Sequence, residues 1–156
     1  MAAHAVFAIA YQGGGEVKSR VLAVDPGEKR IGLAISDSSG VIANPLTVIQ
    51  HVSRVVDAAV IAQIAFENDA CLIVIGQIVE MDGSIGPQGR KAQRMLEALR
   101  QQIDLPLELW DEGGSTQAAR SARIGMGVKR SQRSGHLDDL AATYLLQDFL
   151  DNHPSS

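Results

Sequence analysis

The stretch from Arg20 to Asp37, RVLAVDPGEKRIGLAISD, constrains the fold more than any other part of this chain. Two apolar runs of β-forming residues, 21–24 and 31–35, flank a turn that begins with Asp25-Pro26-Gly27. We therefore predict a β-hairpin in which the aspartate stands at the end of a buried strand. In this interpretation the proline fixes its φ angle, the glycine supplies a positive φ, and the turn directs the carboxylate away from the sheet.

The rest of the chain predicts a mixed sheet covered by helices. A third strand is expected at 41–49, where Pro45 indicates an edge strand or a bulge. After it the pattern alternates between helix and strand, which is typical of parallel strands added by crossovers. The expected elements are a helix at 53–68 with Val52, Val56, Ala59, Val60, Gln63 and Ile64 on its apolar face, a strand at 71–75 buried on both faces, a helix carrying Ala92, Met95, Leu96, Leu99 and Ile103, a strand at 107–110 and a last helix at 137–151.

Length and composition indicate one α/β domain of a globular protein. We expect an N-terminal extension at 1–19, a main domain at 20–151 and a tail at 152–156. The apolar residues 1–11 lack the basic start of a secretory signal, and a disordered leader, an added edge strand and a start codon placed too far upstream all stay open. The single cysteine, Cys71, excludes an internal disulfide and favours a reducing, cytoplasmic location. No apolar run approaches the ~20 residues of a membrane span.

Acidic residues stand at three places that the predicted fold brings to one edge of the sheet. Asp25 ends the first strand, Asp111 and Glu112 end the fifth, and Asp138 lies on the apolar line of the last helix. The carboxyl ends of parallel strands share one edge, and carboxylates gathered there need a cation to offset their repulsion. Oxygen ligands without a Cys/His cluster favour Mg²⁺ or Mn²⁺. We interpret Asp25, Glu112 and Asp138 as catalytic metal ligands, with Asp111 in support.

The net charge of −4 does not suggest a nucleic-acid partner, but the positive charge is unevenly distributed. One segment, 120–136, holds five basic residues and no acid, and a solvated loop is its ordinary explanation. Beside the acids, these residues would instead hold the phosphates of a nucleic acid, together with two basic residues of the first turn. The residues assigned to nucleic-acid binding are Lys29, Arg30, Arg120, Arg123, Lys129, Arg130 and Arg133.

Four segments carry a resemblance to a known family. They are LAVDPGEKRIGLAISD at 22–37, VIGQIVEMDGSIGP at 74–87, DEGGST at 111–116 and LDDLAATYLLQ at 137–147. In their order and spacing the chain resembles the YqgF/RuvX family of Holliday-junction-resolvase-like nucleases, which is associated with maturation of pre-16S ribosomal RNA. The resemblance implies a ribonuclease H-like fold with a five-stranded sheet of order 3-2-1-4-5. It also implies the acids Asp25, Asp111 or Glu112, and Asp138, acting on RNA or branched DNA.

The chain departs from the family pattern at two places. Gln77 and Ile78 stand where the family has Leu-Pro, and Gly113 and Gly114 replace Arg-Leu, which removes an arginine suited to clamping phosphate. A non-catalytic module that binds nucleic acid or the ribosome is therefore one alternative. A sugar-kinase-like or actin-like ATPase is another, but such enzymes need two copies of the fold and this chain supplies one. A homodimer stays open, since symmetric cleavage of a junction requires two active sites.

Other polar residues receive weaker interpretations. The segment 81–87 is either a simple turn or a helix start that faces phosphate. His136 is expected to be a loop or capping residue, with a proton shuttle as the alternative. Trp110 is expected in the core. No role is assigned to His4, His51 and His153.

Overall fold

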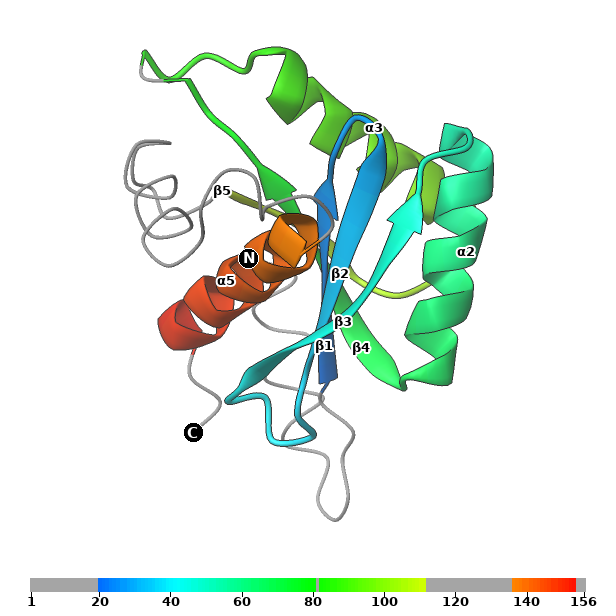
Figure 1. Ribbon diagram of the computed structural model, residues 1–156, viewed down its shortest axis with the longest axis vertical. Helices are drawn as coiled ribbons and strands as arrows, with labels where there is room; N and C mark the ends of the chain where they lie inside the picture. The colour runs from blue at the N-terminus through cyan, green and yellow to red at the C-terminus, as the bar shows by residue number, and fades with distance from the viewer. Residues whose placement is uncertain (1–19, 81, 112–135, 154–156) are drawn as a thin grey trace.

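The computed structural model describes residues 20–80, 82–111 and 136–153, with the backbone alone for residues 88 and 136–139 (Figure 1). The described elements are β1 Arg20–Pro26, β2 Arg30–Ser36, β3 Ala43–Gln50, α2 Arg54–Glu67, β4 Ala70–Gln77, α3 Pro87–Arg100, β5 Leu107–Asp111 and α5 His136–Asn152. The strands form a single sheet of order β3-β2-β1-β4-β5. This order confirms the one that the sequence predicted.

The strand directions also agree with the prediction of a hairpin meander followed by crossovers. β1 pairs antiparallel with β2, and β2 with β3, while β4 lies parallel to β1 and β5 parallel to β4. Pro45 lies on β3, an edge strand, opposite Ala34, where the register between β2 and β3 shifts. Both explanations offered for this proline are therefore confirmed.

Helices cover both faces of the sheet, with α2 and α3 on one side and α5 on the other (Figure 1). The sheet has a hydrophobic core on each face, and alternate residues of β1 belong to each. Leu22 and Val24 face α2 and α3, whereas Val21 and Ala23 face α5. β4 divides in the same way and is fully buried from 72 to 75, as its continuous apolar run predicted. Among the described helices, none is long and apolar enough to cross a membrane.

The predicted buried face of α2 is wrong. Val52, Val56 and Val60 are exposed by 68%, 43% and 38%, and the helix instead buries Asp57, Ala58, Ile61 and Ala65. Both sets of apolar residues recur at helical spacing, so periodicity alone could not choose between them. The structure buries mainly the smaller residues, since alanines at this position let α2 approach the sheet and α3 closely.

Gly27 is required for a different reason from the one predicted. Among the described glycines, positive φ values occur at Gly40 and Gly83 and not at Gly27. A Cβ at position 27 would instead lie 2.4 Å from the carbonyl oxygen of Arg30, which accepts a hydrogen bond from the Gly27 amide at 2.9 Å. The turn thus needs a residue without a side chain because its two ends approach so closely.

The turn between β2 and β3 is organised by the Asp37 carboxylate. It accepts hydrogen bonds from the amides of Val41 and Ile42 at 2.9 and 3.0 Å, and from the hydroxyl of Ser39. Partial burial tends to raise the pKa of Asp37, but these hydrogen bonds outweigh burial and hold the pKa below its ordinary value. The ionised carboxylate therefore stabilises the folded state.

We expect Asp37→Ala to lower the free energy of unfolding by about 1–2 kcal/mol, the scale of hydrogen bonds to a partly exposed charged group. Asp37→Asn should cost less, because its amide oxygen still accepts from the backbone. The pKa of Asp37 is lower in the folded protein than in the unfolded chain, where it is about 3.9. The carboxylate therefore stabilises the fold at pH values above about 3.9, and this stabilisation is lost as the pH falls through the pKa of the folded state. Urea denaturation at pH 7 and at about pH 3 checks this, and a difference that persists undiminished at the lower pH would contradict it.

Candidate functional site

The carboxyl ends of β1, β4 and β5 form one edge of the sheet, and two of the predicted acids lie there. Val24 is level with Ile75, so Asp25 follows at the level of Gly76 and, one strand further, of Trp110. Asp111 pairs with Gln77, one residue beyond that level. The structure thus brings Asp25 and Asp111 to the same edge, two strands apart.

Strand alternation gives the face of the sheet on which each acid is expected. Val21 and Ala23 face α5, so Asp25, the next residue of that parity, falls on the α5 face. Trp110 also packs on the α5 side, against Phe149 with ring centroids 5.3 Å apart. Alternation alone would turn Asp111 to the other face, but the Asp148 charge on α5 still reaches its carboxyl at the end of this edge strand. The tryptophan is a core residue, as predicted.

The backbone of α5 places Asp138 toward the edge that holds Asp25. Gln147 anchors the helix to the start of β3: its side chain accepts from the amide of Ala43 at 2.9 Å and donates to the carbonyl of Val41 at 3.0 Å. That end of the sheet is the one where β1 begins, because Ala43 pairs with Ser36, whose hydroxyl accepts from the amide of Val21.

Asp138 stands nine residues before Gln147, which corresponds to about 13.5 Å of helix. In Figure 1 the first turns of α5, in orange, lie nearer to the arrowhead of β1 than its last turns do. The helix therefore begins toward the end of the sheet where Asp25 stands.

Several predicted residues are outside the described part of the chain. These are Glu112 and the basic residues Arg120, Arg123, Lys129, Arg130 and Arg133, and of Asp138 and His136 only the backbone is described. Among the residues whose side chains are described, no three acidic, histidine or cysteine side chains gather closely enough to hold a metal ion. The described carboxylates of this edge, Asp25 and Asp111, offer the oxygen ligands that Mg²⁺ and Mn²⁺ prefer.

The Asp111 carboxyl lies in an environment that disfavours its charge. Burial raises its pKa, and the nearby carboxylate of Asp148 on α5 raises it further. Asp148 itself accepts a hydrogen bond from the indole nitrogen of Trp110 at 2.9 Å. A cation bound near Asp111 would offset this repulsion.

We expect Asp148→Asn to lower the pKa of Asp111 in the metal-free protein, because it removes the repelling charge while its amide oxygen still accepts from Trp110. A carboxyl-carbon NMR titration measures this. Asp151→Asn, one turn further along α5, is the matched control and should leave the pKa of Asp111 unchanged. An unchanged pKa in Asp148→Asn would mean that burial alone causes the shift.

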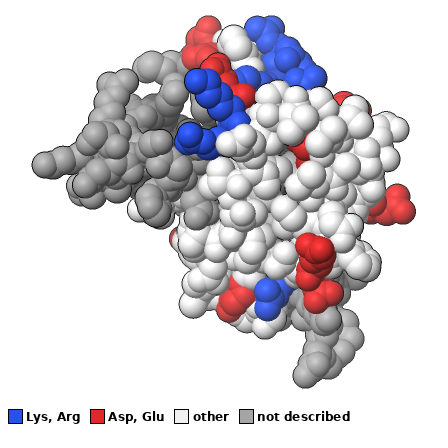
Figure 2. All heavy atoms as spheres, turned by 45° about the vertical axis from the view of Figure 1, so that its right-hand side comes forward, with Lys and Arg blue, Asp and Glu red and all other residues white. Residues whose placement is uncertain are grey.

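Basic side chains from separate elements gather at the end of the molecule that carries the β1–β2 turn. Figure 2 shows Lys and Arg side chains at the upper end of one face, interspersed with Asp and Glu, above a broad uncharged surface. Lys29 and Arg30, predicted to bind nucleic acid, lie at the β1–β2 turn. The sequence analysis missed four residues from α2 and α3 at this end: Arg54, Arg90, Lys91 and Arg94. The i, i+4 spacing of Arg90 and Arg94 was the available signal.

Of the segment 81–87, the described residues 82–87 form a turn rather than an open anion site. Val79 bridges to Ile85, and the Asp82 carboxylate accepts from the Ser84 amide at 2.9 Å. A Cβ built at Gly86, the N-cap of α3, would lie 2.4 Å from a carboxylate oxygen of Glu80. The chain's own carboxylate thus lies against the start of this helix, where it would repel a phosphate.

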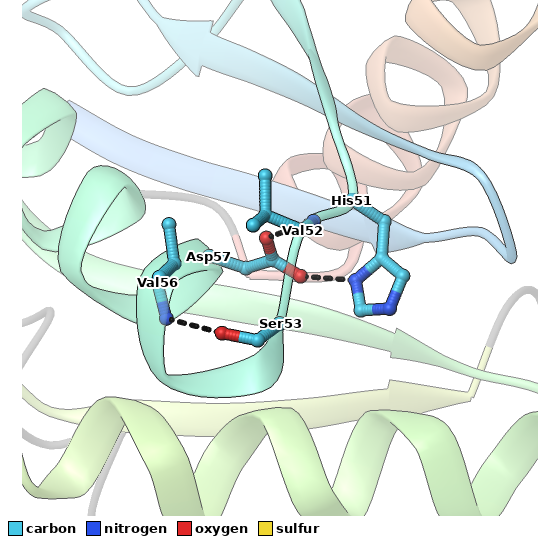
Figure 3. Close-up of polar contacts among 5 residues, drawn as sticks. All are labelled: His51, Val52, Ser53, Val56 and Asp57. Atoms are coloured by element: carbon cyan, nitrogen blue, oxygen red, sulfur yellow. Dashed lines mark hydrogen bonds and ion pairs between the residues drawn. The ribbon is translucent and has the colours of Figure 1, made fainter.

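Of the three histidines to which no role was assigned, His4 lies outside the described residues, and the other two have defined contacts. His153 is buried and stacks on Phe149 with centroids 4.2 Å apart. His51 directs its Nδ1 to the buried carboxylate of Asp57 at the start of α2, as Figure 3 shows. Asp57 also accepts from the amide of Val52 at 2.9 Å. The i, i+4 spacing of Phe149 and His153 was a signal for the first contact, whereas the His51–Asp57 pair depends on how the chain enters α2.

Comparison with known families and proteins gives consistent results. The family model described as RuvX, Holliday junction resolvase, matches residues 19–152. Proteins named "Putative pre-16S rRNA nuclease" from Roseiflexus sp. (strain RS-1) and Caldanaerobacter subterraneus subsp. tengcongensis are 39% and 41% identical to this chain over 133 and 138 residues. These matches cover 85% and 88% of this chain, and 94% and 99% of the relatives.

A solved structure shares the fold. The chain resembles "T. thermophilus RuvC in complex with Holliday junction substrate" with a TM-score of 0.51 and 14% sequence identity. The match covers 87% of this chain and 96% of that one. At this identity the resemblance supports the ribonuclease H-like architecture and nothing further.

Proposed function

The chain belongs to the RuvX family of Holliday junction resolvases, and we propose that this nuclease uses divalent metal ions held by Asp25, Glu112 and Asp138 to hydrolyse structured nucleic acid. The observation that supports the proposal is that α5 begins nearer to the carboxyl end of β1 than it ends (Figure 1). Asp25 and Asp138 belong to these two segments.

We take Glu112 rather than Asp111 as the third ligand. Alternation alone would turn Asp111 away from the α5 face on which Asp25 falls, but the Asp148 charge on α5 still reaches its carboxyl. Asp111 is therefore positioned to act on the site electrostatically. We assign the ligand role to Glu112 and a supporting electrostatic role to Asp111.

The chemistry requires no covalent nucleophile from the protein. Bound Mg²⁺ or Mn²⁺ ions would activate water and stabilise the leaving oxygen of a phosphodiester. The three carboxylates hold and orient the ions. Lys29 and Arg30, together with the basic residues of 120–136, hold the phosphates on either side of the cut bond.

The names of the relatives favour processing of pre-16S ribosomal RNA as the reaction in the cell, with resolution of branched DNA as the alternative. The same acidic site would serve either substrate, since both present phosphodiesters. Cleavage of a junction on both strands would need a homodimer. Incubation with labelled precursor RNA and with a four-way DNA junction, in Mg²⁺ and in Mn²⁺, separates these substrates.

We expect Asp25→Asn, Glu112→Gln and Asp138→Asn each to lower the rate of cleavage by more than about a hundredfold, because loss of even a residue that supports a metal ligand costs 10–100-fold. Binding of the substrate should persist. Asp139→Asn, the neighbour of Asp138 rotated by about 100° on the helix, is the matched control. Asp111→Asn should have a smaller effect than Glu112→Gln.

Undiminished cleavage by Asp25→Asn or Asp138→Asn would remove the proposed mechanism. Tight, salt-sensitive binding by the unmodified protein with no product in either metal would instead identify a non-catalytic nucleic-acid-binding module.

A further inference from the structure

A cavity of about 290 Å³ opens beside the β1–β2 turn, on the α2 and α3 side of the sheet. It begins at Pro26 and Gly27, which directly follow Asp25, and Ile31 and Met95 contribute apolar walls. The charged groups that line it are His51, Arg54, Lys91 and Arg94, with Glu28 and Asp57. The cavity therefore lies on the face of the sheet opposite α5, next to the residues that follow Asp25.

The acids of the cavity leave its positive charge largely unopposed. Asp57 is 2% exposed and its two oxygens are engaged by His51 and the amide of Val52. Glu28 is 75% exposed at the rim, 3.5 Å from the Nζ of Lys91. Among the described residues, neither Arg54 nor Arg94 forms an ion pair. Three permanent cations thus face one exposed and one engaged carboxylate.

The ammonium of Lys91 is the strongest indication of a ligand. Its Nζ is buried and has no hydrogen-bond partner among the described residues. It forms an ion pair with the largely exposed Glu28 carboxylate at 3.5 Å, and an anion in the cavity would supply the hydrogen-bond acceptor that this ion pair does not. Arginines suit an oxyanion better than any neutral ligand, because their planar groups donate two parallel hydrogen bonds to it.

His51 is positioned to contribute a fourth contact. Its Nδ1 is directed to Asp57, and the second ring nitrogen points away from that carboxylate (Figure 3). When the ring is charged, this nitrogen donates a hydrogen bond to a phosphate oxygen while Nδ1 donates to Asp57. The Asp57 contact thus fixes the ring in an orientation that suits a phosphodiester.

A second hollow continues the basic surface. A groove of about 650 Å³ between α2 and α3 shares Arg54 and Arg94 with the cavity and adds Arg90. A nucleic-acid strand presents phosphates at regular intervals, whereas a free phosphate ion would occupy the cavity alone. The arginines that line the two hollows, Arg54, Arg90 and Arg94, outnumber Glu97, the acid that lines the groove, and therefore favour a strand.

We propose that this cavity is a second phosphate-binding site, which holds a backbone phosphate of the nucleic acid whose neighbouring bond lies at Asp25. The assignment rests on the proposed nuclease function. The strand would pass from the acidic edge, over the β1–β2 turn, into the groove between α2 and α3. The site would fix the register of the substrate and take no part in the chemistry.

The test measures binding without cleavage, in the Asp25→Asn protein with EDTA. Lys91→Gln and Arg94→Gln should each weaken binding of a labelled single-stranded RNA by about tenfold at low salt and reduce the slope of log affinity against log salt by about one. Arg100→Gln, on the same helix but paired with Glu97 at 3.7 Å, is the matched control and should change neither. Lys91→Arg should retain most of the affinity.

A second arm uses inorganic phosphate as the probe and the thermal midpoint as the readout. Phosphate should raise the Tm of the Asp25→Asn protein but not that of its Lys91→Gln derivative. RNA affinity within twofold of the parent in both Lys91→Gln and Arg94→Gln would overturn the proposal. If phosphate stabilises the protein while RNA affinity is unaffected, the cavity serves a free phosphate and the strand assignment is wrong. Absence of cleavage by the unmodified protein would refute the nuclease mechanism and leave this binding result standing.

Discussion

The parallel pairing of β1 with β4 is the constraint on which the rest of the molecule depends. Both strands are apolar on both faces, so each must be covered by helices on two sides. A parallel connection requires a crossover, and α2 supplies it. The same pairing aligns the carboxyl ends of β1 and β4, and with β5 it brings Asp25 and Asp111 to one edge of the sheet. The core and this acidic edge thus have one cause.

Much of this architecture could be predicted from the sequence because its signals are local. Continuous apolar runs identified β1 and β4, turn residues identified the hairpin, and Pro45 identified the edge strand. The buried face of α2 could not be predicted, because two apolar stripes compete on that helix. Only the close approach of neighbouring helices selects the one with Ala58 and Ala65. The need for Gly27 was predicted for the wrong reason, since its turn is tight rather than left-handed.

Part of the candidate site could likewise be predicted from the sequence, and part could not. An acid at the end of a strand can be recognised from sequence, and the structure places Asp25 and Asp111 where this reasoning expected them. The basic cavity could not be recognised, because its residues come from the first turn, the start of α2 and the middle of α3. Lys91 and His51 have no meaningful spacing in the chain. A spatial cluster of this kind becomes visible only when the helices are packed.

The contact made by Gln147 has a consequence for how the protein behaves in a crowded solution. An edge strand such as β3 exposes backbone groups that a strand of another molecule can pair with, which leads to aggregation. The side-chain amide of Gln147 accepts a hydrogen bond from the backbone N–H of Ala43 and donates one to the carbonyl of Val41, at the start of β3. The backbone of an added strand would make the same kinds of hydrogen bond. A single side chain thereby blocks strand addition at the end of β3 nearest to it. Protection against intermolecular sheet growth and attachment of the last helix are thus achieved by the same pair of hydrogen bonds.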